Sequence, residues 1–563
     1  MDLIKMPHPI PVPPSGFQAL ILCGPGASLN TFTTNPEEYP KCLIPVGNRV
    51  MLYFPMTYAL RAGITDITLI TPPSSLAPIQ AALQQNPHLT ALPSPRVIAP
   101  KGLDMTMGTA ELLRLPEVQA CIKTDFVLLP CDLICDIPGE SLIEAWMVSQ
   151  GALGGSTLTE GKNAHGPVSS GPGGERGGRR GGLSVFYQTQ GREESVKGES
   201  TDFVAVAPLD QDKNERPAVS HLVDGPEAVR SNLSKLVLAM PMDTLKEKME
   251  QDKGFLIRHS LVEQHPQVKM LTTYRDAHLY IFPYWVKDFA RQEKLESISE
   301  DLLGYWAKAG WQKGLADKLG MKEIFQQESH TEDESGSQDG ESLEDEIDLQ
   351  SMSTTKVGSN FDDSQSPMFA SRVKASPETS KPTEAPPILA YVQRGSAPFV
   401  RRVDSTSILL STSLRLAKLE SIEEAGRQAS HFAHNQKIAH PDGVAQRSTV
   451  TKSDCLLAEN VTVEEKCVIK ESVIGANCHI STGARLTRCL LMDGAVVGPR
   501  AVLTGCVIGK RAKIGREAQL KDCEVQDGNV VEDEADAKNE KFMVFEGIDE
   551  DGDMEDFDDE DEF

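Results

Sequence analysis

The chain has 563 residues, of which 82 are acidic and 56 are basic, and its formal net charge is −26. At about 100–200 residues per domain, this length predicts about two to four domains. The acidic excess argues against a general nucleic-acid-binding surface, because phosphates require a basic face. The sequence has no apolar run of about 18 residues, so it predicts no membrane span. Its 11 scattered cysteines indicate a reducing, cytosolic compartment rather than a disulfide framework.

Residues 16–325 alternate short apolar runs with amphipathic stretches. This alternation is typical of βαβ units and predicts an α/β domain with a mainly parallel, Rossmann-like sheet. The first apolar run ends at a glycine, as a buried strand does before a loop. We predict strands at residues 17–23, 67–70 and 126–130, and helices at residues 51–61 and 141–148.

Four segments lack apolar periodicity, and their composition predicts that they are flexible. They are an N-terminus of residues 1–15, a Gly-rich insertion of residues 151–182, an acidic Ser/Pro-rich linker of residues 326–387 and an acidic tail of residues 546–563. The insertion contains 12 glycines in 32 residues, and the tail contains 12 acidic residues and no basic one. The three arginines in the insertion leave an RNA-binding tract as an alternative, but they are too few for a useful electrostatic footprint.

A repeat of 17 residues runs through residues 448–535. It follows a connecting segment of residues 388–447, in which we predict a short strand and then a helix. Within the repeat, Leu, Ile or Val recurs at intervals of six, six and five residues, from Leu457 to Val531. This period predicts a hexapeptide-repeat, left-handed parallel β-helix, in which three short sides close a triangular coil and stacked coils pair their strands.

Two features of the repeat have structural interpretations. Four glycines follow an inward aliphatic residue, where we expect the backbone to turn tightly; they are Gly475, Gly498, Gly509 and Gly515. A column of cysteines with one serine recurs every 17 residues from Cys455 to Cys523, and strand alternation predicts that it points inward. A metal site or a set of disulfides is the alternative, but no histidine accompanies the column at ligand spacing.

The N-terminal strand runs into a glycine loop, where a helix-flanked sheet can bind phosphate with backbone N–H groups. The loop is Gly24-Pro-Gly-Ala-Ser28, and Pro40-Lys-Cys-Leu-Ile-Pro-Val-Gly47, Met107-Gly-Thr-Ala110 and Leu129-Pro-Cys-Asp132 follow it. In this order the motifs resemble the sugar-nucleotide pyrophosphorylase superfamily. Its signature is a Gly-x-Gly-Thr-Arg loop followed by Pro-Lys and Leu-Pro-Val, then a base-contacting segment and a metal-binding aspartate. The resemblance implies a nucleotidyltransferase-like domain with Gly24, Gly26, Lys41 and Asp132 in the nucleotide pocket.

The departures from this signature argue against catalysis. Ala27-Ser28 stands where the family has Thr-Arg, and a serine cannot supply the positive charge that stabilises departing pyrophosphate. Pro25 removes one N–H from the phosphate cradle, and Cys131 replaces the usual glycine before the aspartate. We therefore predict no catalytic residue, no metal site and no cofactor, and at most a vestigial, weak nucleotide pocket. The alternative is that the four pocket residues now serve only loop geometry and packing.

The whole organisation resembles the two subunit types of eukaryotic translation initiation factor 2B, gamma and epsilon, that join a degenerate nucleotidyltransferase domain to a hexapeptide β-helix. The segment Pro398-Phe-Val-Arg-Arg-Val403 also resembles the family's lead into the β-helix. The epsilon type continues into a HEAT-like helical domain, whereas only about 30 residues follow Val531 here, which favours the gamma type.

The resemblance implies two alternatives that differ in class. The first is a non-catalytic subunit of the guanine-nucleotide exchange complex that acts on initiation factor 2. It would bind the epsilon subunit directly, within a cytosolic decamer that contains two copies each of alpha, beta, gamma, delta and epsilon, with no membrane or direct nucleic-acid partner. The second is an active sugar-nucleotide pyrophosphorylase of the GDP-mannose type, which would need Mg²⁺ held partly by Asp132.

Overall fold

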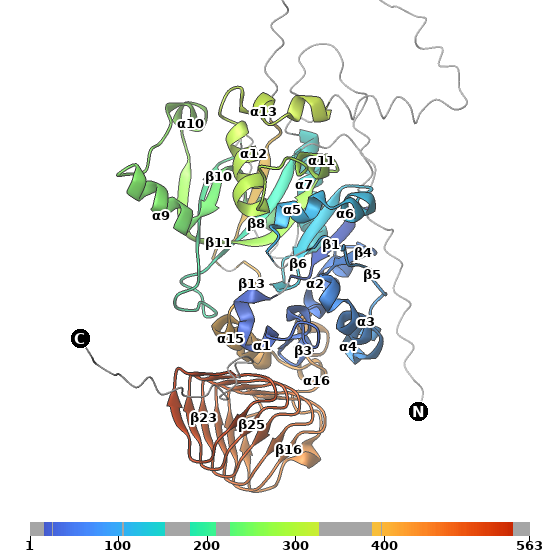
Figure 1. Cartoon of the computed structure of the whole chain (residues 1–563), viewed down its shortest axis with the longest axis vertical. Helices are drawn as coiled ribbons and strands as arrows, with labels where there is room; N and C mark the ends of the chain where they lie inside the picture. Colours follow the sequence, from blue (N-terminus) through green and yellow to red (C-terminus); the bar gives the residue numbers. More distant parts are fainter. Residues whose placement is uncertain are drawn as a thin grey trace, which may run out of the picture.

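The computed structural model shows an α/β domain above a triangular β-helix (Figure 1). It describes residues 16–24, 26–103, 106–152, 181–209, 226–325, 385–395 and 397–543. The predicted N-terminus and acidic tail lie outside these ranges, as do most of the predicted Gly-rich insertion and linker. None of the helices in these ranges combines the length and the apolar character that crossing a bilayer needs.

The first domain is built on a mixed sheet of nine strands in the order β5-β4-β1-β6-β11-β8-β12-β10-β9. The first four are parallel to one another, which fits the predicted βαβ units, and β11 then joins β6 in the antiparallel sense. The predicted α/β class is therefore confirmed, but the sheet is mixed rather than mainly parallel, because β9, β10 and β11 pair in the antiparallel sense. The strands are β1 (Gln18–Leu22), β4 (Asp66–Ile70), β5 (Arg96–Ile98), β6 (Phe126–Pro130), β8 (Gly182–Gln188), β9 (Asp202–Ala207), β10 (Leu233–Pro241), β11 (Lys269–Phe282) and β12 (Ile388–Val392).

Helices cover both faces of this sheet, because its central strands are apolar on both sides. One face packs against α2 (Tyr53–Arg61), α3 (Leu76–Gln85) and α7 (Gly139–Ala152). The opposite face packs against α5 (Thr109–Arg114), α6 (Pro116–Cys121), α11 (Val286–Phe289) and α12 (Leu303–Ala309). Other helices of the first domain are α1 (Asn30–Thr33), α4 (Pro87–Thr90), α8 (Pro226–Ser231), α9 (Met242–Gln251), α10 (His259–Gln264) and α13 (Leu315–Lys318).

The strand predicted for the connecting segment, β12, belongs instead to the first sheet. β12 pairs in parallel with β8 and antiparallel with β10, so it is an internal strand of that sheet. A buried apolar strand has two unpaired edges unless it enters a sheet, and the sequence pattern does not show which sheet accepts it. After β12 the chain forms β13 (Val400–Arg402), which pairs with β7 (Leu133–Cys135), and then α15 (Thr406–Lys418) and α16 (Ile422–Ala425).

The β-helix has three flat faces, each a sheet of parallel two- or three-residue strands stacked in register. The first face contains β14 (Thr449–Val450), β17 (Val468–Lys470), β20 (Arg485–Thr487), β23 (Val502–Thr504), β26 (Gln519–Lys521) and β29 (Asp536–Lys538). The second contains β15 (Leu456–Leu457), β18 (Val473–Ile474), β21 (Leu490–Leu491), β24 (Val507–Ile508), β27 (Glu524–Val525) and β30 (Lys541–Phe542). The third contains β16 (Thr462–Val463), β19 (His479–Ile480), β22 (Val496–Val497), β25 (Lys513–Ile514) and β28 (Val530–Val531).

The β-helix extends beyond the predicted limits of residues 448 and 535. Ile438 and Val444 already form single parallel bridges with Leu457 and Val463, and β29 and β30 continue the stack to Phe542. The aliphatic residues of the repeat point inward, and the cysteine column is buried and free of disulfides, as the sequence predicts.

The expected role of the four repeat glycines is wrong. None of them has a positive φ; the left-handed residues lie at the corners, among them Asn460, Asn477 and Gly494. The glycines are needed because the next coil is close: a Cβ on Gly509 would lie 2.6 Å from the backbone nitrogen of Asp527. They therefore allow close stacking of coils rather than a tight turn.

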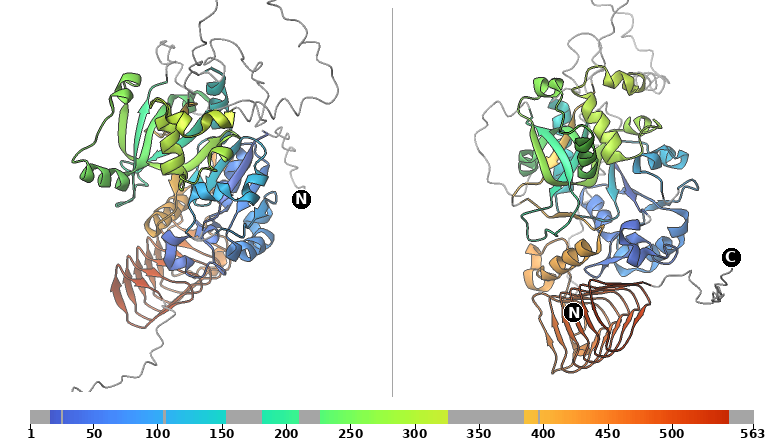
Figure 2. Two further views of the ribbon diagram at one scale, coloured as in Figure 1. Left: turned by 45° about the horizontal axis from the view of Figure 1, so that its top comes forward. Right: turned by 60° about the vertical axis from the view of Figure 1, so that its left-hand side comes forward.

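The second face of the β-helix packs against the first domain. Its outward residues form an apolar stripe, Leu456, Val473, Leu490 and Val507, that is buried with side chains of α15 and of the segment 29–54. Polar contacts flank the stripe: the Thr31 hydroxyl donates to Glu524 Oε2 at 2.7 Å, and Asn48 donates to the carbonyl of Ile474 at 2.9 Å. Figure 2 shows α15 and this segment seated on the β-helix from two further directions.

Candidate functional site

A cavity of about 300 Å³ lies at the carboxyl ends of β1 and β6, where the sequence places the nucleotide pocket. Gly24, Gly26, Lys41 and Asp132, the four predicted pocket residues, all line it. Gly26 is left-handed (φ 89°), and a Cβ there would lie 2.8 Å from Cβ of Lys41. The structure thus brings the predicted residues together, and the glycine allows the close approach of the lysine.

The two charged residues predicted for the pocket are joined to each other. The Lys41 ammonium donates to Asp132 Oδ2 at 2.6 Å, and both side chains are largely buried. Arg402 of β13 approaches the other carboxylate oxygen, with Nε 3.5 Å from Oδ1. Both oxygens of Asp132 therefore face cations of the protein itself.

The electrostatics agree with this geometry. Burial alone would raise the pKa of Asp132, but the charges of Lys41 and Arg402 hold it well below its ordinary value. Burial would likewise lower the pKa of Arg402, and the charge of Asp132 raises it instead. The carboxylate is thus ionised at neutral pH and neutralised from two sides.

Arg402 and His278 also line this cavity and are not among the residues that the sequence predicts for it. Arg402 supplies a guanidinium, although we expected none because Ser28 stands at the arginine position of the signature. It comes from a strand about 270 residues away from Asp132 in sequence, so local motif spacing could not reveal it. The sequence does show two adjacent arginines, Arg401 and Arg402, in the segment 398–403. Only the fold shows that Arg402 lines the cavity.

His278 is the other missed residue. It lies in β11 where the pairing with β8 is irregular, and its backbone is left-handed (φ 51°), which is uncommon for a residue with a side chain. Its ring stacks on Tyr280 at a centroid distance of 6.0 Å, and both residues line the cavity. Burial and the charge of Arg402 lower the pKa of His278, so it is neutral at pH 7.

A buried carboxyl group, Asp276, lies behind these rings. Its Oδ2 accepts the Tyr280 hydroxyl at 2.6 Å, and its Oδ1 accepts the backbone N–H of His278 at 2.9 Å. Burial raises the pKa of Asp276 to about 7. Asp276 therefore changes charge near neutral pH while it holds the irregular part of β11.

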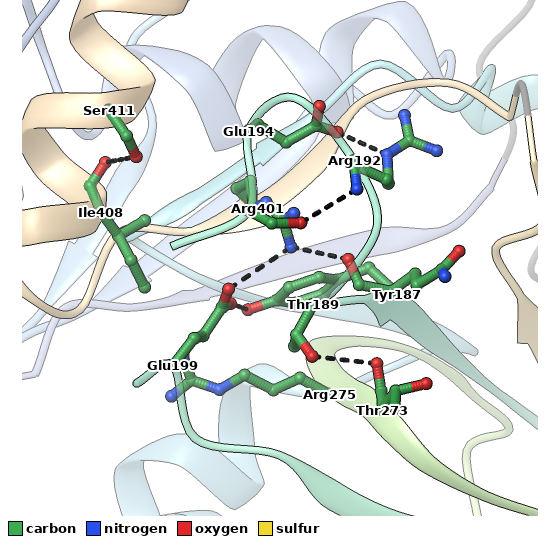
Figure 3. Close-up of polar contacts among 12 residues, drawn as sticks. Tyr187, Thr189, Arg192, Glu194, Glu199, Thr273, Arg275, Arg401, Ile408 and Ser411 are labelled. Carbon is green, nitrogen blue, oxygen red and sulfur yellow. Dashed lines mark hydrogen bonds and ion pairs between the residues drawn. The ribbon is translucent and has the colours of Figure 1, made fainter. Parts of the chain in front are cut away.

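Arg401, the residue before Arg402, makes a second set of polar contacts, which Figure 3 shows. Arg401 is fully buried, donates to the carbonyl of Gln188 at 2.9 Å, and lies 3.7 Å from Glu199 Oε2. Glu199 in turn accepts the Tyr187 hydroxyl at 2.9 Å. Because neighbouring side chains of a strand point to opposite faces, β13 is held through Arg401 on one side and Arg402 on the other.

The cavity does not fit the Mg²⁺ that the pyrophosphorylase resemblance implies. A magnesium site needs carboxylate oxygens that are free to coordinate the ion. Both oxygens of Asp132 instead face side-chain cations, Lys41 and Arg402. Across the described ranges, no group of three or more His, Cys, Asp and Glu side chains has an arrangement that could hold a metal ion.

Comparison with known proteins adds two similarities. Residues 435–538 match the family model of the left-handed β-helix domain of the EIF2B epsilon subunit. The chain is also 27% identical over 303 residues to "Translation initiation factor eIF2B subunit gamma" of Schizosaccharomyces pombe. The chain is thus similar to an eIF2B gamma subunit over part of its length, and its β-helix is similar to that of eIF2B epsilon. The aligned part is 53% of this chain and 53% of that protein, so the match spans about half the length of each.

Proposed function

We propose that the chain is a non-catalytic subunit of a cytosolic translation initiation factor 2B complex. In this proposal it supports guanine-nucleotide exchange on initiation factor 2 by binding an epsilon-type subunit, within a decamer that also contains alpha, beta and delta subunits. The observation that carries the proposal is the similarity to an eIF2B gamma subunit, together with the similarity of its β-helix to that of eIF2B epsilon.

The candidate site supports the non-catalytic part of this proposal. The lysine and aspartate that would serve a nucleotidyltransferase instead hold β13 through the Lys41–Asp132–Arg402 cluster. β13 leads directly into α15, on which the β-helix is seated. On this reading the former pocket fixes the orientation of the two domains, which is what a subunit that works by docking requires.

Co-purification tests the proposal. The full-length chain, tagged at one end, is isolated from cells of its source at physiological salt, with an unrelated tagged protein as the control. Four additional subunits in constant proportion, and stimulation of GDP release from initiation factor 2 by the isolated complex, are the expected results. Recovery of the chain without such partners would refute the assembly.

An active sugar-nucleotide pyrophosphorylase is the second candidate, because the cavity reaches the lower end of the size range of ligand pockets and contains the Arg402 guanidinium. The test incubates the purified protein with GTP, mannose 1-phosphate and Mg²⁺ and measures pyrophosphate. We expect no turnover above that of the Lys41→Ala variant. Robust turnover that this substitution abolishes would establish the enzyme instead.

We also propose that Gly24, Gly26, Lys41 and Asp132 retain only weak affinity for nucleotides. One of the three charges in the cluster is uncompensated, since two cations face one carboxylate. Isothermal titration of the isolated complex with GTP and GDP measures this affinity. Lys41→Ala should abolish any binding, whereas Thr57→Ala on α2, which does not line the cavity, serves as the control.

A further inference from the structure

An apolar groove of about 400 Å³ lies in the first domain, away from the candidate site. α9, α10 and the connection between them form one wall, and β9, β10 and α12 form the floor and the other wall. Buried apolar residues make up the floor, among them Phe203 of β9, Leu238 of β10 and Trp311, which follows α12. The Trp311 indole N–H donates to the carbonyl of Val237 at 2.9 Å, so the floor itself needs no polar partner there.

The rim of the groove exposes large apolar side chains. Leu256 is 71% exposed, Ile257 49%, Met270 42% and Met249 41%, and all four line the same groove. Isolated exposed apolar residues are common on protein surfaces, but a contiguous set around a concavity marks a binding surface. Methionines suit such a surface because their flexible side chains adapt to an occupant.

The charge around the groove is predominantly positive. Lys248, Arg258 and Lys308 line it, with Asp252 as the acidic residue among the lining positions. Burial and the nearby charges of Lys248 and Arg258 lower the pKa of Lys308, so the three cations are close enough to repel one another. An occupant that carries carboxylates as well as apolar side chains would relieve this repulsion.

The chain itself contains a segment of this chemistry. Residues 544–563, outside the described part, carry 12 acidic residues and no basic one, and they also contain Phe545, Ile548, Met554, Phe557 and Phe563. Twenty residues reach up to about 70 Å, whereas a domain of about 300 residues is about 50 Å across. In Figure 1 the last coil of the β-helix, after which this segment begins, and α9 both lie on the left of the view, with the β-helix below the first domain.

We propose that the apolar groove between α9, α10 and α12 binds the acidic C-terminal segment 544–563 of the same chain. The apolar residues of the segment would cover the rim residues of the groove, and its carboxylates would face Lys248, Arg258 and Lys308. While the C-terminal segment occupies the groove, another acidic, apolar segment can bind there only by displacing it. This inference stands apart from the proposed function, since it concerns one chain alone.

Photo-crosslinking of the full-length chain tests the proposal. Phe557 is replaced by the photoreactive p-benzoylphenylalanine, the purified chain is irradiated at low concentration, and crosslinked peptides are identified by mass spectrometry. The expected crosslinks join residue 557 to the groove residues between 248 and 270 within one chain. Raising the salt to 0.5 M, where the Debye length is roughly 4 Å, should lower their yield.

Matched variants make the result specific. Lys248→Glu combined with Arg258→Glu should lower the crosslink yield roughly fivefold or more, and Leu256→Asp should act in the same direction. Lys246→Glu on the same helix and Val262→Asp on α10, both exposed and outside the groove lining, should leave it unchanged. Crosslinks confined to other surfaces would overturn the proposal. Dimer crosslinks whose yield rises with concentration would also overturn it, because they would indicate the tail of a second copy.

Discussion

Replacing Asp132 by asparagine tests whether the Lys41–Asp132–Arg402 cluster stabilises the first domain. The carboxylate is 2% exposed, 2.6 Å from the Lys41 ammonium and 3.5 Å from Nε of Arg402. The neutral amide leaves two largely buried cations facing each other without compensation. Breaking a buried pair by removing one partner costs about 3–5 kcal/mol. We therefore expect Asp132→Asn to lower the free energy of unfolding of the first domain by about 4 kcal/mol.

Urea unfolding, followed by the fluorescence of the buried Trp285 and Trp306, measures this loss. With a slope of about 3 kcal/mol per molar urea, the midpoint of the tryptophan transition should fall by about 1.3 M. Asp136→Asn is the matched control, since Asp136 is 33% exposed and its pair with Arg61 spans 3.5 Å. A partly exposed pair of this kind, with a long separation, contributes about 0–1 kcal/mol.

The stability of Asp132→Asn and that of a double variant together test the electrostatic explanation. If Asp132→Asn stays within about 1 kcal/mol of the unaltered protein, the cluster does not hold the domain, and the reasoning is refuted. The double variant Lys41→Met with Asp132→Asn should recover part of the lost stability, because a cation is removed with its partner. A double variant that is less stable than Asp132→Asn would contradict the electrostatic explanation.

Three further predictions concern the two domains. Leu490→Asp places a charge in the buried stripe between β-helix and first domain, so in small-angle scattering the domains should separate, whereas Val502→Asp on an exposed face should leave the scattering unchanged. Gly509→Ala should lower the melting temperature of the β-helix more than Gly528→Ala does. The first puts a Cβ 2.6 Å from a neighbouring backbone nitrogen, and the second meets open space and costs about 1 kcal/mol for its left-handed backbone. The pKa of Asp276 is raised from 3.8 to about 7, so its contribution to the free energy of unfolding is greatest below pH 4 and falls as the pH rises to 7. This loss of stability is about 4 kcal/mol. Urea midpoints measured between pH 4 and 8 should show it in the unaltered protein and not in Asp276→Asn. The same dependence of the midpoint on pH in both proteins would refute the assignment to Asp276.

The sequence determined the parts of this protein that depend on local periodicity. The 17-residue repeat predicts the β-helix, because each inward aliphatic residue must stack on its equivalent in the next coil. The order of motifs along the α/β domain likewise predicts that Gly24, Gly26, Lys41 and Asp132 meet, since loops after parallel strands gather at one edge of a sheet.

Tertiary structure alone decided what these parts contact. An isolated apolar strand carries no mark of the sheet that it joins, so the place of β12 between β8 and β10 was missed. The stripe Leu456, Val473, Leu490 and Val507 recurs with the same period of 17 and was visible in the sequence, but only packing shows that it faces α15. Arg402 reaches Asp132 from a distant strand, and a charge pair of that kind depends on the path of the backbone, which residue spacing does not encode.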